Sequence, residues 1–487
     1  MNRRGNEMNF SIVRHVIGYV LVAESAFMAL PCIVALIYQE QDGWSFVITA
    51  VLCLLLGGLL LYKKPENKIF YVKEGFVTVA LSWIILSVMG SIPFLMTGSI
   101  TNPVDAMFET VSGFTTTGAS VLTDVEVLSK SVLFWRSFTH WIGGMGVLVF
   151  LLAVVHMKGG GSHMNLMKAE SPGPSVNKLV PTVRSTAKIL YVIYIVMTII
   201  EIVLLLIGRM PLFDALTISF GTAGTGGFGI KNDSMAGYSV YLQVVVTIFM
   251  ILFGVNFSAY FLILRKKFKQ AFSMEEVRSY FLIILASIGV IAIMIKDMYG
   301  SIWAAIQQAA FQVGSIITTT GYATTDFNLW PEVPKTILVL LMFVGACAGS
   351  TGGGIKVSRL VILLKTVKKE LHTLLHPRSL KKLQMDGHLL EHETVRATNV
   401  FIMAYVLIFV FSVLLVGFDG HDLITNFTGV AATLNNIGPG LELVGPTQNF
   451  SIFSNGAKLV LIFDMLAGRL EIFPLLLLFV RDTWKKF

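Results

Sequence analysis

Four short runs of small residues have the composition of a backbone that could bind an ion. They are Thr115-Thr116-Thr117-Gly118, Gly224-Thr225-Gly226-Gly227, Thr318-Thr319-Thr320-Gly321 and Asn435-Asn436-Ile437-Gly438. Glycine reaches backbone angles that are closed to other residues, so such a run can turn its carbonyl groups inward without side-chain bulk. Four runs around one axis would form a cage of carbonyl oxygens that replaces the water shell of a cation. The runs contain no carboxylate, which argues for a monovalent ion.

The four runs stand in matching surroundings. Each follows an apolar stretch too short to cross a bilayer, and stretches long enough to cross it lie on both sides. Asp105, Asp214, Gln308 and Thr425 stand thirteen residues before the four glycines. We expect Asp105 and Asp214 to be the N-caps of short re-entrant helices. The partly negative C-terminal ends of these helices would then point at the runs and favour a cation there.

The composition is that of a membrane protein. Of its 487 residues 55% are hydrophobic and only 14% are charged, against about 25% charged in average soluble domains. The net charge of +8 comes from basic blocks between apolar stretches, as the positive-inside rule requires, so we expect no nucleic-acid partner.

The three cysteines lie in apolar stretches without metal-like spacing. We find no paired His/Glu pattern or Ser/Lys dyad at membrane depth, and therefore expect no enzyme.

We predict an all-α polytopic membrane protein with ten spans around one pore. Two N-terminal helices, about residues 13–38 and 44–62, precede four repeats of span, re-entrant pore helix with filter loop, and returning span. The predicted units are a two-helix unit at 1–68, pore repeats at 69–158, 189–270, 271–365 and 397–487, and cytoplasmic segments at 159–188 and 366–396. The predicted re-entrant helices cover residues 104–114, 212–223, 302–317 and 423–434, and the predicted returns cover 131–157, 238–264, 335–364 and 457–480.

Both termini are predicted to be cytoplasmic. Most of the 37 Lys and Arg residues fall in the segments that this topology places inside the cell. We expect no cleavable leader, because the first nine residues are polar and basic and the first apolar run is long enough to span.

Only the third returning span is interrupted in this prediction, by the glycine-rich stretch from Gly345 to Gly354. A phosphate-binding loop would need Gly-Lys-Ser/Thr after a strand, but here Ile355 follows the last glycine within an apolar span. A flexible kink is one alternative. We favour a movable gate, because each glycine costs a helix about 1 kcal/mol relative to alanine.

These residues resemble the Trk/Ktr/HKT superfamily of potassium transporters, and within it the TrkH type. The resemblance rests on the four runs, with Phe228 and Tyr322 after the second and third. It also rests on Trp141-Ile142-Gly143-Gly144-Met145-Gly146, on the stretch from Ala348 to Lys356, and on Ala467-Gly468-Arg469-Leu470-Glu471. It implies a potassium uptake subunit of the bacterial inner membrane, a homodimer with one pore per protomer. A cytosolic ring of TrkA-like nucleotide-binding subunits would regulate it.

The resemblance also implies roles for individual residues. Potassium, the transported ion, would contact Thr116, Thr117, Thr225, Gly226, Thr319, Thr320, Asn436 and Ile437. The gate would consist of Gly349, Ser350, Thr351, Gly352, Gly353, Gly354 and Arg469. No organic cofactor is implied, and lipid surrounds the chain. The runs lack the TVGYG pattern of potassium channels, so K⁺ over Na⁺ selectivity and possible symport of H⁺ or Na⁺ stay open.

The main alternative is a cation-coupled secondary transporter with alternating access, which predicts two related halves with broken helices in matching places. One broken span in four units disfavours it.

Among the other charged residues, Asp464 or Glu471 could neutralise Arg469. We interpret Arg136 and His140 as packing or interfacial residues, and Glu24 and Glu201 as partnered core residues rather than proton-coupling groups. The basic segment at 365–396 is either a docking surface for the cytosolic regulator or a solvated helical hairpin near lipid headgroups.

Overall fold

The computed structural model describes residues 8–65, 72–146, 183–378 and 382–484. Most of the predicted linker at 159–188, the first returning span beyond residue 146 and residues 485–487 lie outside these ranges. Within them the chain is helical except for loops and one small hairpin of strands β1 (Gln384–Met385) and β2 (His388–Leu389). The predicted all-α membrane fold is confirmed.

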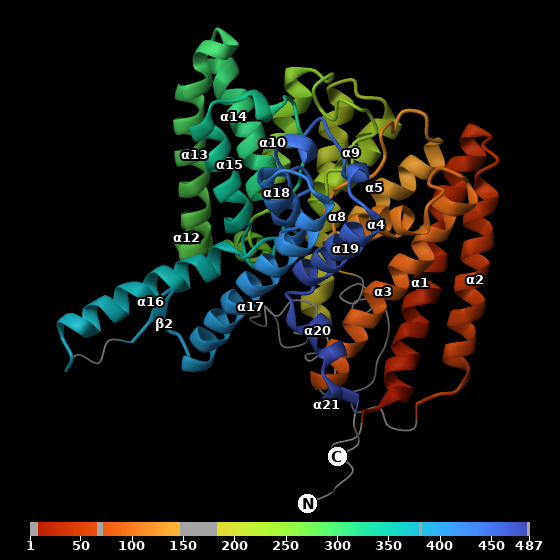
Figure 1. Ribbon diagram of the computed structural model, residues 1–487, viewed down its shortest axis with the longest axis horizontal. Coiled ribbons are helices and arrows are strands. Elements are labelled where there is room, and N and C mark those ends of the chain that lie inside the picture. Colours follow the sequence, from red (N-terminus) through yellow and green to blue (C-terminus); the bar gives the residue numbers. More distant parts are fainter. Residues whose placement is uncertain (1–7, 66–71, 147–182, 379–381, 485–487) are drawn as a thin grey trace, which may run out of the picture.

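Two N-terminal helices, α1 (Phe10–Tyr38) and α2 (Gly43–Tyr62), form an antiparallel pair at one edge of the molecule (Figure 1). They approach closely where Gly57 faces Gly18, since a Cβ on Gly57 would lie 3.0 Å from the Gly18 oxygen. Glu40 in the connecting turn accepts hydrogen bonds from the backbone N–H groups of Lys130 (2.6 Å) and Ser131 (2.9 Å). This carboxylate therefore caps the first returning helix and fastens the pair to the pore repeats.

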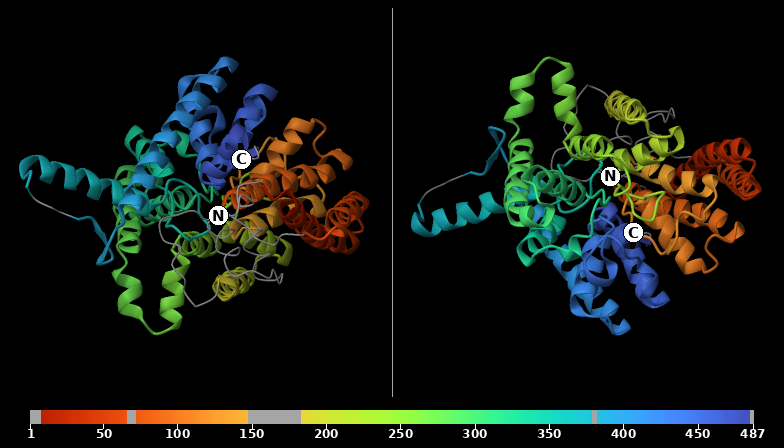
Figure 2. Two further views of the ribbon diagram at one scale, coloured as in Figure 1. Left: turned by 90° about the horizontal axis from the view of Figure 1, so that it is seen from below. Right: turned by 90° about the horizontal axis from the view of Figure 1, so that it is seen from above.

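Four units follow, and they surround a common centre in chain order (Figure 2). The first has α3 (Val72–Met96), α4 (Pro103–Phe114) and α5 (Lys130–Gly144); the second has α8 (Val183–Ile207), α9 (Leu212–Gly224), α10 (Val240–Phe253) and α11 (Phe257–Leu264). The third has α13 (Glu275–Tyr299), α14 (Ile302–Ile317), α15 (Glu332–Val344) and α16 (Val357–Leu375); the fourth has α17 (His392–Val416), α18 (Leu423–Leu434), α19 (Asn455–Arg469) and α20 (Phe473–Leu476). The described residues also contain two short helices, α12 (Phe268–Ser273) and α21 (Arg481–Trp484). They contain the 3₁₀ turns η2 (Phe327–Leu329), η3 (Gly417–Asp419), η4 (Glu442–Val444), η5 (Phe450–Ile452) and η6 (Leu477–Phe479).

The N-caps of the short helices differ from those predicted. Asn102 caps α4 and Asp422 caps α18, each accepting a backbone N–H at 2.9 Å. The N-cap position of α9 is Pro211, so the N-cap assignments of Asp105 and Asp214 were both wrong by three residues. Both aspartates lie in the first helical turn instead. Asp105 pairs there with Lys458 of α19 at 2.7 Å, and Asp214 accepts a hydrogen bond from the Tyr238 hydroxyl at 2.8 Å. The bond from the Thr425 side chain lowers the pKa of Asp422, which favours the charged cap.

The prediction of a single broken return was also wrong. The second return bends by 92° between α10 and α11, where Asn256 accepts a hydrogen bond from the N–H of Ser258 (2.8 Å) and starts the new helix. The fourth return ends at Arg469 instead of residue 480, because Glu471 and Ile472 adopt positive φ angles (53° and 71°) that no α-helix contains. Breaks therefore occur in the second, third and fourth units.

The ten predicted spans stay a prediction. In the described residues six helices are long and apolar enough to cross a membrane, or seven if the bent pair counts as one span. The returning helices α5, α10, α15 and α19 have 15, 14, 13 and 15 residues. At 1.5 Å per residue they cover roughly 20–22 Å of a hydrocarbon core about 30 Å thick.

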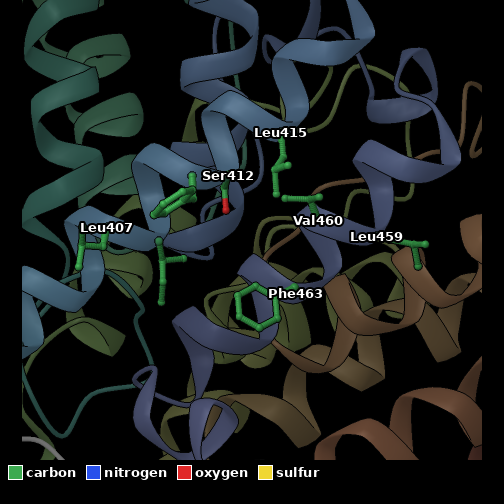
Figure 3. A pocket seen from close by; sticks show the side chains of 8 residues that line it. Leu407, Ser412, Leu415, Leu459, Val460 and Phe463 are labelled. Carbon is green, nitrogen blue, oxygen red and sulfur yellow. The ribbon is translucent and has the colours of Figure 1, made fainter. Parts of the chain in front are cut away.

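An apolar groove of about 400 Å³ lies between α17 and α19 (Figure 3). Its walls are aliphatic and aromatic apart from Ser412, whose hydroxyl donates to Asp464 at 2.6 Å. Asp464 is thus bound by Ser412 of α17, and the groove has no charged side chain that would attract an ion.

Candidate ion-binding site

The chain makes the same turn at the ends of α4, α9, α14 and α18. In each turn an N–H group bonds to a carbonyl five residues earlier: Thr117 to Ser112 (2.9 Å), Gly226 to Gly221, Thr320 to Ser315 and Ile437 to Ala432 (2.8 Å each). These bonds have the pattern of a Schellman motif. The four pore helices therefore end in register and direct their partly negative carbonyl ends at the runs.

The residue before each of these donors has a left-handed conformation. Thr116, Thr225, Thr319 and Asn436 have φ angles of 56°, 54°, 61° and 57°. Such a conformation is unusual for a β-branched residue and costs about 1–3 kcal/mol. Its recurrence at four matching positions indicates that the site imposes it.

The φ angle also alternates in sign along each run. In the first run Thr116 and Gly118 have positive φ while Thr117 between them does not, and the other three runs repeat this order. Successive carbonyls face opposite sides in an extended strand. Alternating handedness instead turns successive peptide groups towards one side. Each run can therefore present a row of oxygens to the centre.

The four glycines meet carbonyl groups of neighbouring runs. A Cβ on Gly118 would lie 1.9 Å from the carbonyl oxygen of Gly226, and a Cβ on Gly227 would lie 1.9 Å from that of Thr320. A Cβ on Gly321 would lie 2.0 Å from the carbonyl oxygen of Ile437, and a Cβ on Gly438 would lie 2.9 Å from that of Thr117. The first run thus touches the second, the second the third, the third the fourth, and the fourth the first. The four runs form one closed ring, and only a residue without a Cβ fits between the backbones.

A polar cavity of about 190 Å³ opens on one side of this ring. All four glycines line it, together with residues that follow the first, second and fourth runs, such as Ser120, Phe228 and Gln448. Below we call this cavity the mouth.

The loop between α15 and α16, residues 345–356, lies on the other side of the ring. The N–H of Gly353 donates to the Thr319 hydroxyl (2.6 Å), and the N–H of Gly354 donates to the Asn435 carbonyl (3.1 Å). A Cβ on Gly352 would lie 2.8 Å from the Thr318 oxygen. The loop therefore contacts the third and fourth runs at the end away from the mouth.

The same loop is bound to the break in the second return. The N–H of Cys347 donates to Gly254 O (3.0 Å), the N–H of Phe257 donates to Gly349 O (3.0 Å), and the Thr351 hydroxyl donates to Phe253 O (3.2 Å). Lys356 at the end of the loop is buried and donates to the Gly352 carbonyl. The broken second return is thus the support on which the loop rests.

Arg469 joins the loop to the first unit. Its guanidinium donates to the carbonyls of Thr351 (3.1 Å), Gly144 (2.8 Å) and Gly143, and it lies 3.4 Å from the Thr116 hydroxyl. Its cationic group therefore lies beside the first run and the loop, on the side away from the mouth. Of the two expected neutralising carboxylates, Glu471 forms its ion pair with Arg359 and Asp464 accepts from Ser412.

Arg136 and His140, which sequence analysis treated as packing residues, support the first two runs. Arg136 forms a buried ion pair with Glu109 of α4 at 2.7 Å and donates to Gly229 O at 3.1 Å. The His140 ring bonds Gly113 O at 2.7 Å through Nδ1 and accepts the N–H of Phe228 at 3.2 Å through Nε2. An acceptor at Nε2 requires the tautomer with its proton on Nδ1.

The His140 ring also explains a difference between the runs. The first and third runs carry threonine pairs whose hydroxyls are hydrogen bonded, Thr115 to Thr117 (2.8 Å) and Thr318 to Thr320 (2.7 Å). In the second run Gly226 occupies the position that matches Thr117 and Thr320. A Cβ on Gly226 would lie 2.2 Å from the His140 ring. The histidine thus fills the space that a side chain occupies in the related runs.

The expectation that the two isolated acids are partnered core residues was wrong for both. Glu24 in α1 is 1% exposed and Glu201 in α8 is 0% exposed. None of their carboxylate oxygens has a hydrogen-bond partner among the described residues. Neither acid belongs to the ring or the loop.

Comparison with known proteins gives one consistent family. The model of the TrkH family, described as cation transport protein, matches residues 43–486. The potassium uptake proteins TrkH of Vibrio parahaemolyticus and of Salmonella typhimurium are 37% and 36% identical to this chain, each over 98% of this chain and all of the relative. The TrkG potassium uptake protein of Escherichia coli is 34% identical over 99% of this chain.

A solved structure agrees with these relatives. The crystal structure of the potassium transporter TrkH from Vibrio parahaemolyticus superposes with a TM-score of 0.88 at 34% identity, covering 98% of this chain and all of that one. Both the sequence and the fold of the chain thus match over nearly its whole length. The chain belongs to the TrkH family of cation transport proteins.

Proposed function

We propose that this chain takes up potassium across the cell membrane through a channel-like pore whose selectivity filter is the ring of four runs. The observation that carries the proposal is the closed contact of four glycines with four carbonyls of the neighbouring runs. Relatives of similar length are named potassium uptake proteins, which supports the choice of ion. Transport in this proposal involves no covalent chemistry.

Carbonyl groups suit this task because they offset the loss of hydration without binding the ion too tightly for release. The oxygens assigned to potassium are those of Thr116, Thr117, Thr225, Gly226, Thr319, Thr320, Asn436 and Ile437. The C-terminal ends of four pore helices add a partial negative charge equivalent to about −0.5 each. The field at the ring thus favours a cation without a carboxylate in the runs.

The gate in this proposal is the loop of residues 345–356 with Arg469. The loop contacts the runs from the side away from the mouth, and Arg469 holds it to the first unit. A cation leaving the ring would meet a positive guanidinium at a few ångströms, which is strongly unfavourable at low dielectric. Opening therefore requires both groups to move.

Regulation and assembly belong to the same proposal. Helix α16 projects from the body (Figure 1), and apolar side chains along it are exposed: Leu364, Val367, Leu371, Leu374 and Leu375. An exposed apolar stripe of this kind favours a second copy of the chain as its cover, hence a homodimer. The cytosolic TrkA-like nucleotide-binding ring is proposed to act on the cytoplasmic ends of these helices, in the bacterial inner membrane with both termini inside.

Breaks in three returning helices are the observation that keeps alternating access as the second candidate. The two mechanisms, a channel-like pore and alternating access, differ in their transport kinetics.

Uptake of ⁸⁶Rb⁺ into vesicles containing the purified protein, with Na⁺ and Li⁺ as competitors, tests the proposal of potassium uptake. We expect Rb⁺ entry that K⁺ suppresses more strongly than Na⁺ or Li⁺; entry of a non-ionic solute without Rb⁺ entry would overturn it.

Alanine substitutions in the ring should lower ion preference in a graded way. Gly118→Ala and Gly227→Ala place a Cβ 1.9 Å from a backbone oxygen, whereas Gly438→Ala leaves 2.9 Å. Overpacking of this kind costs about 1–3 kcal/mol, so we expect the first two to reduce K⁺ over Na⁺ preference about tenfold and the third less. Competition in ⁸⁶Rb⁺ uptake measures this. Gly289→Ala in α13 is the control, because a Cβ there meets no atom within 4 Å outside its own stretch of helix. Equal effects of the three ring substitutions and this control would contradict the ring.

Removing the gate should raise flux. Deleting residues 349–354, or replacing Arg469 by alanine, takes away the groups that lie against the runs on the side away from the mouth. We expect both changes to increase initial ⁸⁶Rb⁺ influx several-fold at an unchanged amount of folded protein. Influx that falls in both variants while their melting curves match the parent would show that these groups do not obstruct the path.

A further inference from the structure

A buried carboxylate in the first turn of α13 holds both ends of the loop. Glu276 is 2% exposed, and its Oε1 accepts the N–H of Ala348 (2.6 Å) at the start of the loop and the N–H of Ser358 (3.2 Å) just after its end. Its Oε2 accepts the Asn256 amide at 3.3 Å. One side chain from the third unit thus connects the loop, α16 and the break in the second return.

These contacts suit a carboxylate. Ser358 lies in the first turn of α16, whose N-cap Lys356 makes no side-chain cap, so the Glu276 carboxylate satisfies a free helix N–H there. Hydrogen bonds to an ionised acceptor contribute roughly twice as much as neutral ones. Because both N–H groups donate to one oxygen, loss of this carboxylate removes the anchor at Ala348 and the one at Ser358 together.

The preceding residue connects this anchor to the cytoplasmic hairpin. Helix α13 has Met274 as its N-cap, which offers no side-chain bond, and the carboxylate of Asp386 accepts the N–H of Glu275 instead (2.6 Å). In return, Glu275 accepts the N–H of Asp386 (3.1 Å) and pairs with Lys365 of α16. Asp386 occupies the turn between β1 and β2. The hairpin thus caps the turn of α13 that carries the loop anchor.

We propose that Glu276 is the positioning residue that keeps the loop of residues 345–356 in place across the ion path, and that the β1–β2 hairpin controls this anchor through Glu275. The inference rests on the proposed function, since it assigns the loop to the gate. It adds the residue that fastens the loop and the route by which a change at the cytoplasmic face reaches it. Neither role involves contact with the ion.

The test uses the full chain in vesicles, with the three native cysteines replaced by alanine and a reporter, Thr351→Cys, in the loop. Thr351 is fully buried, so a membrane-impermeant, permanently charged thiosulfonate applied from the cytoplasmic side reports displacement of the loop. We expect Glu276→Ala to raise both the modification rate and ⁸⁶Rb⁺ influx about tenfold, the effect of losing one charge-assisted anchor. We expect Asp386→Ala to raise both by a smaller factor.

Two further variants separate positioning from folding. Glu276→Gln keeps an oxygen for the Ala348 and Ser358 N–H groups and should lie closer to the parent than Glu276→Ala. Glu332→Ala is the matched control, because Glu332 also lies in the first turn of a helix, but its carboxylate is exposed and forms an ion pair with Lys335 of the same helix. If Glu276→Ala does not fold, Glu276→Asp, which retracts the carboxylate by one methylene, takes its place with the same expectation.

The outcomes distinguish the two proposals. Faster modification without Rb⁺ influx in any variant would support the anchor and refute potassium conduction. Normal parental influx with modification rates equal in Glu276→Ala, Glu276→Gln and the parent would refute the anchor and leave conduction intact. If Glu276→Ala raises the modification rate of the cysteine reporter and Asp386→Ala does not, the role of the hairpin would be refuted and the role of Glu276 would stand.

Discussion

The approach of glycine backbones to neighbouring carbonyl groups is the constraint on which this structure depends. A Cβ would lie within 2.0 Å of a carbonyl oxygen at three of the four ring contacts and at 2.9 Å at the fourth, so the pore helices must end at one depth and in one register. The matching Schellman turns deliver that register, and left-handed threonine and asparagine residues are the strained positions that it requires. The long helices around them supply the packing that keeps four unfavourable turns in place.

The ring is fourfold in its backbone but not in its side chains. Hydroxyl pairs brace the first and third runs, the His140 ring fills the equivalent space beside the second, and Asn436 of the fourth donates to the Thr117 hydroxyl at 2.9 Å. Different side chains thus support one backbone geometry. The side away from the mouth is less symmetric still among the described residues, because the loop there comes from the third unit and Arg469 from the fourth.

The sequence predicted the parts that depend on local pattern. Apolar stretches of two lengths predicted the re-entrant helices to within two residues at either end, and small residues before glycine predicted the ring positions. The break at Asn256 was missed because its only local signal, Gly254 and Asn256, lies inside a long apolar run. The roles of Glu276 and His140 depend on partners 72 and 88 residues away, and no local pattern announces such contacts.

The central claim is that backbone oxygens of the four runs replace the water around a potassium ion. Anomalous scattering from crystals of the protein grown with Rb⁺ in place of K⁺ tests it most directly. The account predicts an anomalous peak on the axis of the ring, within coordination distance of the Thr117, Gly226, Thr320 and Ile437 carbonyls. A structure at saturating Rb⁺ with the ring intact, no peak on the axis and Rb⁺ bound elsewhere in the membrane region would contradict it.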